Sequence, residues 1–440
     1  MCAALAVSYA RASTQGAVAI QASTGADDQR VRQVYLYFAP LTLLVYMALP
    51  DGYLLDLGTS FLLKDQLHAT PSQVSLFRLV TAIPVYLAVL FGIARDSWNP
   101  FGLRDRGLFL IFAPLCTLVL LWTAFSPLSF VTLTAGMLLV AVGFRFISAA
   151  YQGLLALVSQ EQGMAGRLSS LYNFGSYLCY ATGAVASGYL AEHLAPRVLF
   201  LIAAALTALL TVLGVWQPQA IYAHLYDQPI AQRGRGLGDL RTLFASRATY
   251  PAVLLVSVAN FGTASSTPLQ FYLADELHAP DSVYANFTAL NIAAYLPVFV
   301  LYAMLCKRVR LSRLLWWGTL LTLPSTVPLA FLHTPHQLLL AAIPLAMLSG
   351  IAQGAYIDLA LRSCPPGLQG TLMTLVIGVW TLSFRGGDVV GAWLYTSYPG
   401  HGLSYCVAAT TVVGLLLVPL VLMIPRHLTD TSDGDTAAAA

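Results

Sequence analysis

The sequence predicts an all-α integral membrane protein in which twelve transmembrane helices form two six-helix pseudo-repeats. Three observations support this fold class. The 440 residues are 58% hydrophobic and only 9% charged, whereas a soluble domain is about 45–50% apolar. Many apolar runs reach the roughly 20 residues that a helix needs to cross a bilayer. Two segments of the first half also recur in the second half. Lipid must therefore solvate most of the surface.

The helices follow from apolar runs that end at turn-forming or charged residues. We place them near 35–63, 72–94, 107–125, 128–157, 168–191, 198–217, 250–273, 282–305, 314–332, 337–361, 368–394 and 402–424. Most connections are short, but one polar stretch is long enough to separate two bundles. We therefore predict a disordered cytoplasmic tail at 1–34, an N-terminal bundle at 35–217, a cytoplasmic linker at 218–249, a C-terminal bundle at 250–424 and a cytoplasmic tail at 425–440. We expect the ending "TDTSDGDTAAAA" at 429–440 to be disordered.

The distribution of lysine and arginine predicts the orientation in the membrane, because basic residues tend to stay on the cytoplasmic side. The tails, the linker and the loops 95–106 and 307–313 hold most of the 22 basic residues. If both termini are cytoplasmic, the predicted outer loops contain only Lys64 and Arg197. We therefore expect an inner-membrane or plasma-membrane protein with both termini in the cytoplasm.

Composition and motifs argue against several classes of function. The formal net charge is only +3, and without a basic arm we expect no nucleic-acid partner. The six cysteines are scattered with no C-x-x-C pair, so we expect neither a disulfide framework nor a metal site. No H-E-x-x-H motif occurs, and we expect neither catalysis nor a cofactor. The expected partners are the lipid bilayer and a small solute, and we expect a monomer.

Two internal repeats relate the halves. The segment "FLLKDQLHAT" at 61–70 matches "FYLADELHAP" at 271–280, a constant offset of 210. The helix that begins near Gly166 matches the helix that begins near Gly370, an offset of 204. Two like-oriented six-helix halves joined by a linker are typical of carriers that work by alternating access, with the solute site between the halves.

The charged stretch "FGIARDSWNPFGLRDRG" at 91–107 connects the second and third predicted helices. It resembles the signature loop of the major facilitator superfamily, with the conformational motif formed by Gly92, Asp96, Gly102, Arg104 and Arg106. The long spacing between the aspartate and the second glycine resembles the folate–biopterin transporter branch, as does the preceding "FLLKDQLHATPSQVSLF". The resemblance implies the major facilitator fold and transport of a folate or pterin. Asp105 departs from the signature, which has consecutive arginines there.

The residue types of this loop indicate a conformational clasp. At the end of a helix, Asp96 can bond Arg104 or Arg106 and the free amide groups at the start of a neighbouring helix. Such a clasp forms in one conformation and breaks in the other. The alternative is an ordinary solvated loop on the positive side of the membrane.

Ionisable residues inside the predicted spans are the main candidates for a solute or proton site, since each costs about 2.5–3.5 kcal/mol in lipid. They are Asp51, Asp56, Arg78, Arg145, Asp358, Arg385 and Asp388. Asp51 lies near mid-depth between Pro50 and Gly52, where we expect the first helix to break. It is a candidate proton or substrate site, or a cap of the broken turn. Arg145 suits an anionic substrate, or pairs with an acid such as Asp51.

The remaining charged residues suggest ion pairs. Asp56 and Arg78 lie at similar depth on consecutive helices, so we expect a structural pair, with a gated substrate contact as the alternative. Asp358 lies one turn before Arg362 and favours a structural pair. Arg385 and Asp388 are spaced i,i+3, which permits an intrahelical pair or a functional site. Further candidates for the solute site are Gln152, Tyr53, Asn260 and Asn291.

Taken together, these features predict a secondary carrier, driven by protons, that moves a small organic anion or a pterin- or folate-like solute. The fourth predicted helix holds Arg145 and Gln152 where the resembling branch has an acidic pattern, so both solute classes stay open. The alternative is a membrane protein that assists assembly of a pigment or membrane complex without transport. The intramembrane charges favour transport.

Overall fold

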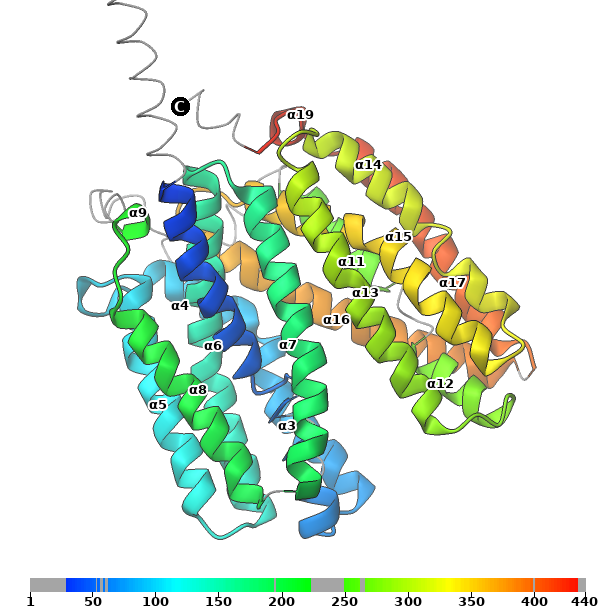
Figure 1. The fold of residues 1–440 in the computed structure, drawn as a ribbon, viewed down its shortest axis with the longest axis horizontal. Helices are drawn as coiled ribbons and strands as arrows, with labels where there is room; N and C mark the ends of the chain where they lie inside the picture. Colours follow the sequence, from blue (N-terminus) through cyan, green and yellow to red (C-terminus); the bar gives the residue numbers. More distant parts are fainter. Residues whose placement is uncertain are drawn as a thin grey trace, which may run out of the picture.

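The computed structural model describes residues 29–52, 54–55, 58–59, 62–193, 195–222, 249–261, 266–398 and 400–433. Within these residues the regular structure is helical, and Figure 1 shows the helices gathered into two bundles. The predicted all-α fold is confirmed. The linker predicted at 218–249 lies almost wholly outside the described residues.

The N-terminal bundle begins with a helix at 29–47, earlier than the predicted start at 35. It continues with the π-helical turn η1 (Leu62–Gln66), α3 (Pro71–Tyr86), α4 (Ala88–Ser97), the 3₁₀ turn η2 (Pro100–Gly102), α5 (Asp105–Phe125), α6 (Phe130–Glu161), α7 (Ala165–His193), α8 (Pro196–Val215) and the short α9 (Gln219–Tyr222). Here α5 packs against both α6 and α8.

The C-terminal bundle holds α11 (Thr249–Phe261), α12 (Ser266–Asp275), α13 (Asp281–Leu305), α14 (Leu311–Thr322), η4 (Val327–Phe331), α15 (Pro335–Arg362), α16 (Gln369–Ser397), α17 (Gly402–Leu415), α18 (Leu417–Leu422) and α19 (Arg426–Thr429). Each predicted span has a helical counterpart. Within the described residues, several predicted single helices are divided: 72–94 into α3 and α4, 314–332 into α14 and η4, and 402–424 into α17 and α18. The predicted helix 250–273 corresponds to α11 and α12, with 262–265 outside the described residues.

Eight helical segments of the described residues are long and apolar enough to cross a membrane by themselves. The difference from the predicted twelve has a physical cause. The helix at 29–47 stops at a break, and α11 has only 13 residues. The helices α7 and α16 have 29 residues each, but their Ser, Gly and Tyr or charged residues lower their hydropathy. These four segments complete the two bundles.

The hairpin repeat predicted from sequence is present in the backbone. His68 has a φ of 48° and His278 a φ of 49°, a left-handed conformation that is uncommon outside glycine. The amide of Ala69 donates to the carbonyl of Leu63 at 2.8 Å, and the amide of Ala279 donates to that of Leu273 at 2.8 Å. The two halves therefore repeat the same turn at the offset of 210.

The two bundles meet near one face and spread apart toward the other (Figure 1). The meeting face carries residue 29, the loops 98–104, 162–164 and 363–368, and the C-terminal segment 426–433; it is called the terminal face below. Across the interface, α13 packs against α7, and α16 packs against α4 and α6. The molecule is thus closed at its terminal face.

Candidate functional site

The first helix breaks where proline and glycine predict it. Helix 29–47 ends before Pro50, and residues 50–52 form a turn in which the amide of Gly52 donates to the carbonyl of Leu49 at 2.9 Å. Beside the turn, Arg145 on α6 donates through its Nη2 to Asp51 Oδ1 at 2.5 Å. Of the predicted alternatives for Arg145, the structure contains the pair with Asp51.

The environment of this ion pair is asymmetric. The side chain of Arg145 is 5% exposed, whereas that of Asp51 is 43% exposed. The Nε of Arg145 and the Oε1 of Gln152 are buried and have no hydrogen-bond partner among the described residues. A buried polar atom left unpaired costs about 1–3 kcal/mol. Because the two residues are seven positions apart, they lie on the same face of α6. This face of α6 therefore holds one buried donor and one buried acceptor that lack partners among the described residues.

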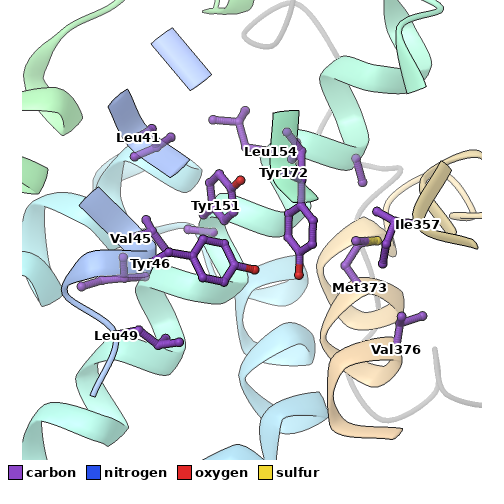
Figure 2. Close-up of a cluster of buried hydrophobic side chains, with 14 of the residues drawn as sticks. Leu41, Val45, Tyr46, Leu49, Tyr151, Leu154, Tyr172, Ile357, Met373 and Val376 are labelled. Carbon is purple, nitrogen blue, oxygen red and sulfur yellow. The ribbon is translucent and has the colours of Figure 1, made fainter. Parts of the chain in front are cut away.

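A layer of tyrosines lies between this pair and the terminal face. Tyr46, Tyr151 and Tyr172 surround one another with ring centroids 5.6–6.4 Å apart. Figure 2 shows their side chains facing those of Ile357, Met373 and Val376 from the C-terminal half. All of these residues are buried. Since Tyr151 is six residues beyond Arg145 on α6, the layer begins about 9 Å from the ion pair. It separates Arg145 from the terminal face.

The C-terminal half contains a cavity of about 270 Å³ whose described lining holds no charged side chain. Eight of the lining residues carry aromatic rings or amide groups: Tyr177, Tyr284, Phe287, Tyr295, Tyr356, Asn260, Asn291 and Gln353. The predicted residues Asn260 and Asn291 both line it. Their amide nitrogens donate to the carbonyls of Val256 at 2.8 Å and Ala342 at 3.0 Å. A cavity of this size and character suits a small planar solute.

A row of tyrosine rings joins the cavity to the first half. Tyr177 lines the cavity, and its ring centroid lies 6.2 Å from that of Tyr180 with the two rings tilted. Tyr180 in turn lies 5.9 Å from Tyr46, which precedes Asp51 by five residues. The cavity and the Asp51–Arg145 pair therefore lie along one aromatic path between the halves.

The predicted clasp at the terminal face is formed by Asp96, and it reaches across the interface. Its Oδ1 accepts from the amide of Gly370 at 3.1 Å, and its Oδ2 accepts from the amide and hydroxyl of Thr371 at 2.7 and 2.6 Å. These amides are free because they begin α16. The carboxylate also favours the positive end of the helix dipole. Asp96 therefore joins α4 of one half to α16 of the other.

The cationic partner of Asp96 is Arg95, and not Arg104 or Arg106 as predicted. The Nη1 of Arg95 lies 2.7 Å from Asp96 Oδ1, and its Nε and Nη2 lie 2.5 and 2.7 Å from the two oxygens of Asp105. This bidentate contact explains why residue 105 is an aspartate where the signature has an arginine. An arginine there would repel Arg95, whereas the aspartate holds it in place.

The other motif residues shape the loop or bind it to neighbouring helices. A Cβ on Gly92 would lie 2.7 Å from the carbonyl of Gly370, so the glycine permits the close crossing of α4 and α16. Gly102 and Arg104 have φ values of 71° and 52°, which makes the turn tight. Arg106 donates to the carbonyls of Gly214 and Val215 at the end of α8, at 3.0 and 3.2 Å.

The remaining predicted residues lie in several places. Arg362 Nε lies 2.7 Å from Asp358 Oδ1, so the expected pair is present, at the terminal end of α15. Asp388 accepts from the amide and hydroxyl of Thr267 at 3.2 and 2.9 Å, at the start of α12. Arg385 is exposed, and an ion pair between it and Asp388 stays a prediction. Tyr53 and Asp56 lie outside the described residues, so the pair of Asp56 with the exposed Arg78 also stays a prediction.

Comparison with known proteins identifies the family to which this architecture belongs. The sequence model of the Major Facilitator Superfamily matches residues 37–387. The chain belongs to the Major Facilitator Superfamily. It is 22% identical over 358 residues to Folate transporter 2 of Plasmodium falciparum, covering 77% of each chain. It is 24% identical over 394 residues to the Folate-biopterin transporter of Synechocystis sp., covering 84% of this chain and 78% of the relative.

Solved members of the superfamily have the same fold. The proton:xylose symporter XylE superposes with a TM-score of 0.65 at 15% identity, over 94% of this chain and 99% of XylE. A bacterial homologue of the iron transporter ferroportin, in an outward-facing state, gives a TM-score of 0.64 at 16% identity, over 88% of this chain and 98% of the homologue. The membrane-protein fold predicted from sequence is confirmed.

Two groups of residues were not predicted from the sequence. Arg95, Asp105 and Thr371 complete the contacts of the superfamily loop, and Arg167 and Asp433 form a second charged cluster. Residues 425–440 are predicted as a cytoplasmic tail that is disordered from 429, yet 426–429 are helical and Asp433 is buried. The offset of 204 between Gly166 and Gly370 is the signal that points to both helix starts.

Proposed function

We propose that this superfamily member is a proton-driven secondary carrier that works by alternating access and moves a small planar organic anion of the pterin or folate type. The observation that carries the proposal is the Asp51–Arg145 pair at the break in the first helix. A broken helix with an ionisable group between two six-helix halves is the arrangement in which carriers bind solutes and coupling ions. The two folate-transporting relatives support the solute class.

The pair supplies the two chemical groups that coupled transport needs. The Nε of Arg145 is unpartnered among the described residues and the group is almost fully buried, so an anion gains a charge-assisted hydrogen bond there. Asp51 is accessible and shares the guanidinium. Protonation of Asp51 would free Arg145 for an anionic solute, and deprotonation would return the guanidinium to Asp51. This exchange links proton movement to solute binding.

The cavity in the second half suits the uncharged part of such a solute. Its rings can stack on a planar heterocycle, and Asn260 and Gln353 offer amide groups to ring nitrogens and carbonyls. The carboxylate of the solute would then reach Arg145 along the tyrosine row. The solute would therefore contact both halves, as alternating access requires.

The Asp96 clasp would hold the terminal face closed during one part of the transport cycle. The positive-inside rule supports a cytoplasmic position for that face, because its loops 95–106 and 307–313 are rich in basic residues. With Asp96 bound to α16, the solute site faces the other side. Opening to the cytoplasm requires the bonds from Asp96 to Gly370 and Thr371 to break.

The experiment is uptake into proteoliposomes with an imposed pH gradient, screened over small organic anions, pterins and folates. We expect one class to accumulate with inward proton flow and to lose accumulation when the gradient is collapsed. Arg145→Lys keeps the charge but loses the forked geometry, so we expect solute uptake to fall at least tenfold. Asp51→Asn should retain exchange of solute and lose accumulation.

Two results would contradict the proposal. Equal accumulation with and without the proton gradient removes proton coupling. No accumulation of any solute, together with an unchanged cellular phenotype for Arg145→Ala, favours the alternative of an assembly protein without transport.

A further inference from the structure

The terminal face has a second charged cluster that the first clasp does not explain. Its centre is Asp433, whose side chain is 1% exposed. The Oδ1 accepts from the amide of Gly166 at 2.9 Å, and the Oδ2 accepts from the amide of Arg167 at 2.9 Å. These amides begin α7. The C-terminal segment of the second half thus binds the start of a helix in the first half.

The two clusters are related by the internal repeat. Asp96 binds the amides of Gly370 and Thr371, and the offset of 204 carries these positions onto Gly166 and Arg167, which bind Asp433. In both places one carboxylate bridges two consecutive amides at a helix start. In both places a cation of the carboxylate's own half holds it: Arg95 at 2.7 Å from Asp96, and Arg362 at 3.2 Å from Asp433.

The repeat also shows why the second carboxylate comes from the end of the chain. The hairpin offset of 210 carries Asp96 onto Cys306, so the second half has a thiol where the first half has its aspartate. Asp433 occupies that place, since its amide donates to the carbonyl of Cys306 at 3.0 Å and its Oδ2 lies 3.8 Å from the Cys306 sulfur. The C-terminal segment therefore supplies the carboxylate that the loop after α13 lacks.

The contacts also indicate which bonds break when the face opens. The segment is attached to the second half through Cys306 and through Arg362, which donates to Thr431 Oγ1 at 3.0 Å and to Asp433. Arg362 is itself fixed by Asp358 at 2.7 Å, and Asp358 accepts from the hydroxyl of Tyr302 at 2.9 Å. By contrast, only Gly166 and Arg167 of the first half are hydrogen-bonded to Asp433 among the described residues.

We propose that the segment Arg426–Asp433 is a working part of the transport cycle: Asp433 clasps the start of α7 when the terminal face is closed and leaves it when that face opens. The proposal rests on the carrier function proposed above. The two clasps then act reciprocally, because each half inserts a carboxylate, held by its own arginine, into a helix start of the other half. Both must release for the bundles to part.

The native thiol of Cys306 offers a readout that does not depend on transport. It is 1% exposed beneath Asp433, and burial raises the pKa of the thiol, with Asp433 adding to the rise. A raised pKa lowers the thiolate fraction, so labelling of the closed state is slow. Opening of the face exposes the Cys306 thiol, so labelling becomes faster.

The test measures the rate at which a membrane-permeant maleimide labels Cys306 in membranes, with the remaining cysteines replaced by alanine. We expect Asp433→Asn to raise the rate about tenfold, since hydrogen bonds to a charged group contribute strongly. The matched control is Asp430→Asn, because Asp430 is an exposed acid in the same segment. Arg167→Gln, which keeps the carboxylate bound to the two amides, should give a smaller rise and serves if Asp433→Asn does not fold.

The outcomes separate this proposal from the carrier proposal. The clasp is overturned if Asp433→Asn and Asp430→Asn are labelled at equal rates, whatever the uptake assay gives. If Asp433→Asn does not fold, equal labelling rates for Arg167→Gln and the parent protein overturn it instead. Faster labelling in a protein that accumulates no solute would retain the clasp as a conformational device and count against the carrier. Faster labelling with reduced uptake supports both.

Discussion

At the scale of single residues, the terminal face shows how a buried charge is made tolerable. Asp96 is 2% exposed at its side chain, and an isolated carboxylate in such a place costs several kcal/mol. It is compensated by Arg95, by two helix-start amides and by the Thr371 hydroxyl. Several of these partners belong to the other half. When the halves part, the carboxylate keeps Arg95 but loses its partners on Gly370 and Thr371, which makes the charge sensitive to conformation.

The first prediction concerns Asp105. Its substitution by alanine leaves Arg95 buried with one carboxylate in place of two, and breaking a buried pair of this kind costs about 3–5 kcal/mol. We expect a clear fall in the Tm of the purified protein in detergent. Asp430→Ala removes an exposed acid and should leave the Tm unchanged. An unchanged Tm for Asp105→Ala would mean that Arg95 does not need its second partner.

The second prediction concerns Asp96. Asparagine at this position keeps the shape but removes the charge, weakening the bonds to Gly370 and Thr371 by about 1–2 kcal/mol. Cys364 is 5% exposed near this clasp, and burial raises the pKa of its thiol. With Cys364 as the remaining cysteine, Asp96→Asn should speed maleimide labelling about tenfold. A rate equal to that of the parent protein would show that the clasp does not hold the face closed.

At the scale of helices, the sequence predicts positions well and tertiary partners poorly. Apolar runs locate each span because lipid imposes a length and a composition, and Pro50 with Gly52 locates the break in the first helix. The divisions between α3 and α4 and between α14 and η4 are not visible in hydropathy, since each lies inside a run that is apolar enough for a single span. Asp433 is missed because its segment is short and polar, and tertiary contacts such as those with Gly166 and Arg362 hold it in place.

The third prediction concerns the starts of α7 and α16, where glycine permits close approach. A Cβ on Gly370 would lie 2.6 Å from Arg95 Cδ, and a Cβ on Gly166 would lie 2.6 Å from Cys306 Cβ. Overpacking of this kind costs about 1–3 kcal/mol. We expect Gly370→Ala and Gly166→Ala to lower the Tm and to speed labelling at the terminal face.

Gly386 provides the control on the same helix. A Cβ at that position meets nothing within 4 Å among the described residues, and alanine is the better helix former by about 0.5–1 kcal/mol. Gly386→Ala should therefore leave the Tm unchanged or raise it. If all three alanine variants behave alike, the close approach at the clasps is not what these glycines provide.

At the scale of the whole molecule, each half binds a helix start of the other half through a carboxylate, but the two carboxylates come from different parts of the halves. In the first half the carboxylate comes from the last turn of α4, and in the second it comes from the segment after α18. Between the clasps, Gln160 on α6 donates to the carbonyls of Leu361 and Cys364 at 2.9 and 2.8 Å. The closed face thus combines these polar contacts with the apolar packing of the tyrosine layer against Ile357, Met373 and Val376.

The last prediction concerns the combination of both clasps. Among the described residues, Asp96 and Asp433 have no hydrogen-bond partner in common, and independent sites contribute additively to a free energy. If one opening breaks both, their effects on the equilibrium multiply. Asp96→Asn with Asp433→Asn should therefore raise the labelling rate of Cys306 by the product of the single effects, about a hundredfold when each is tenfold. A double variant no faster than either single one would mean that the clasps open in separate steps.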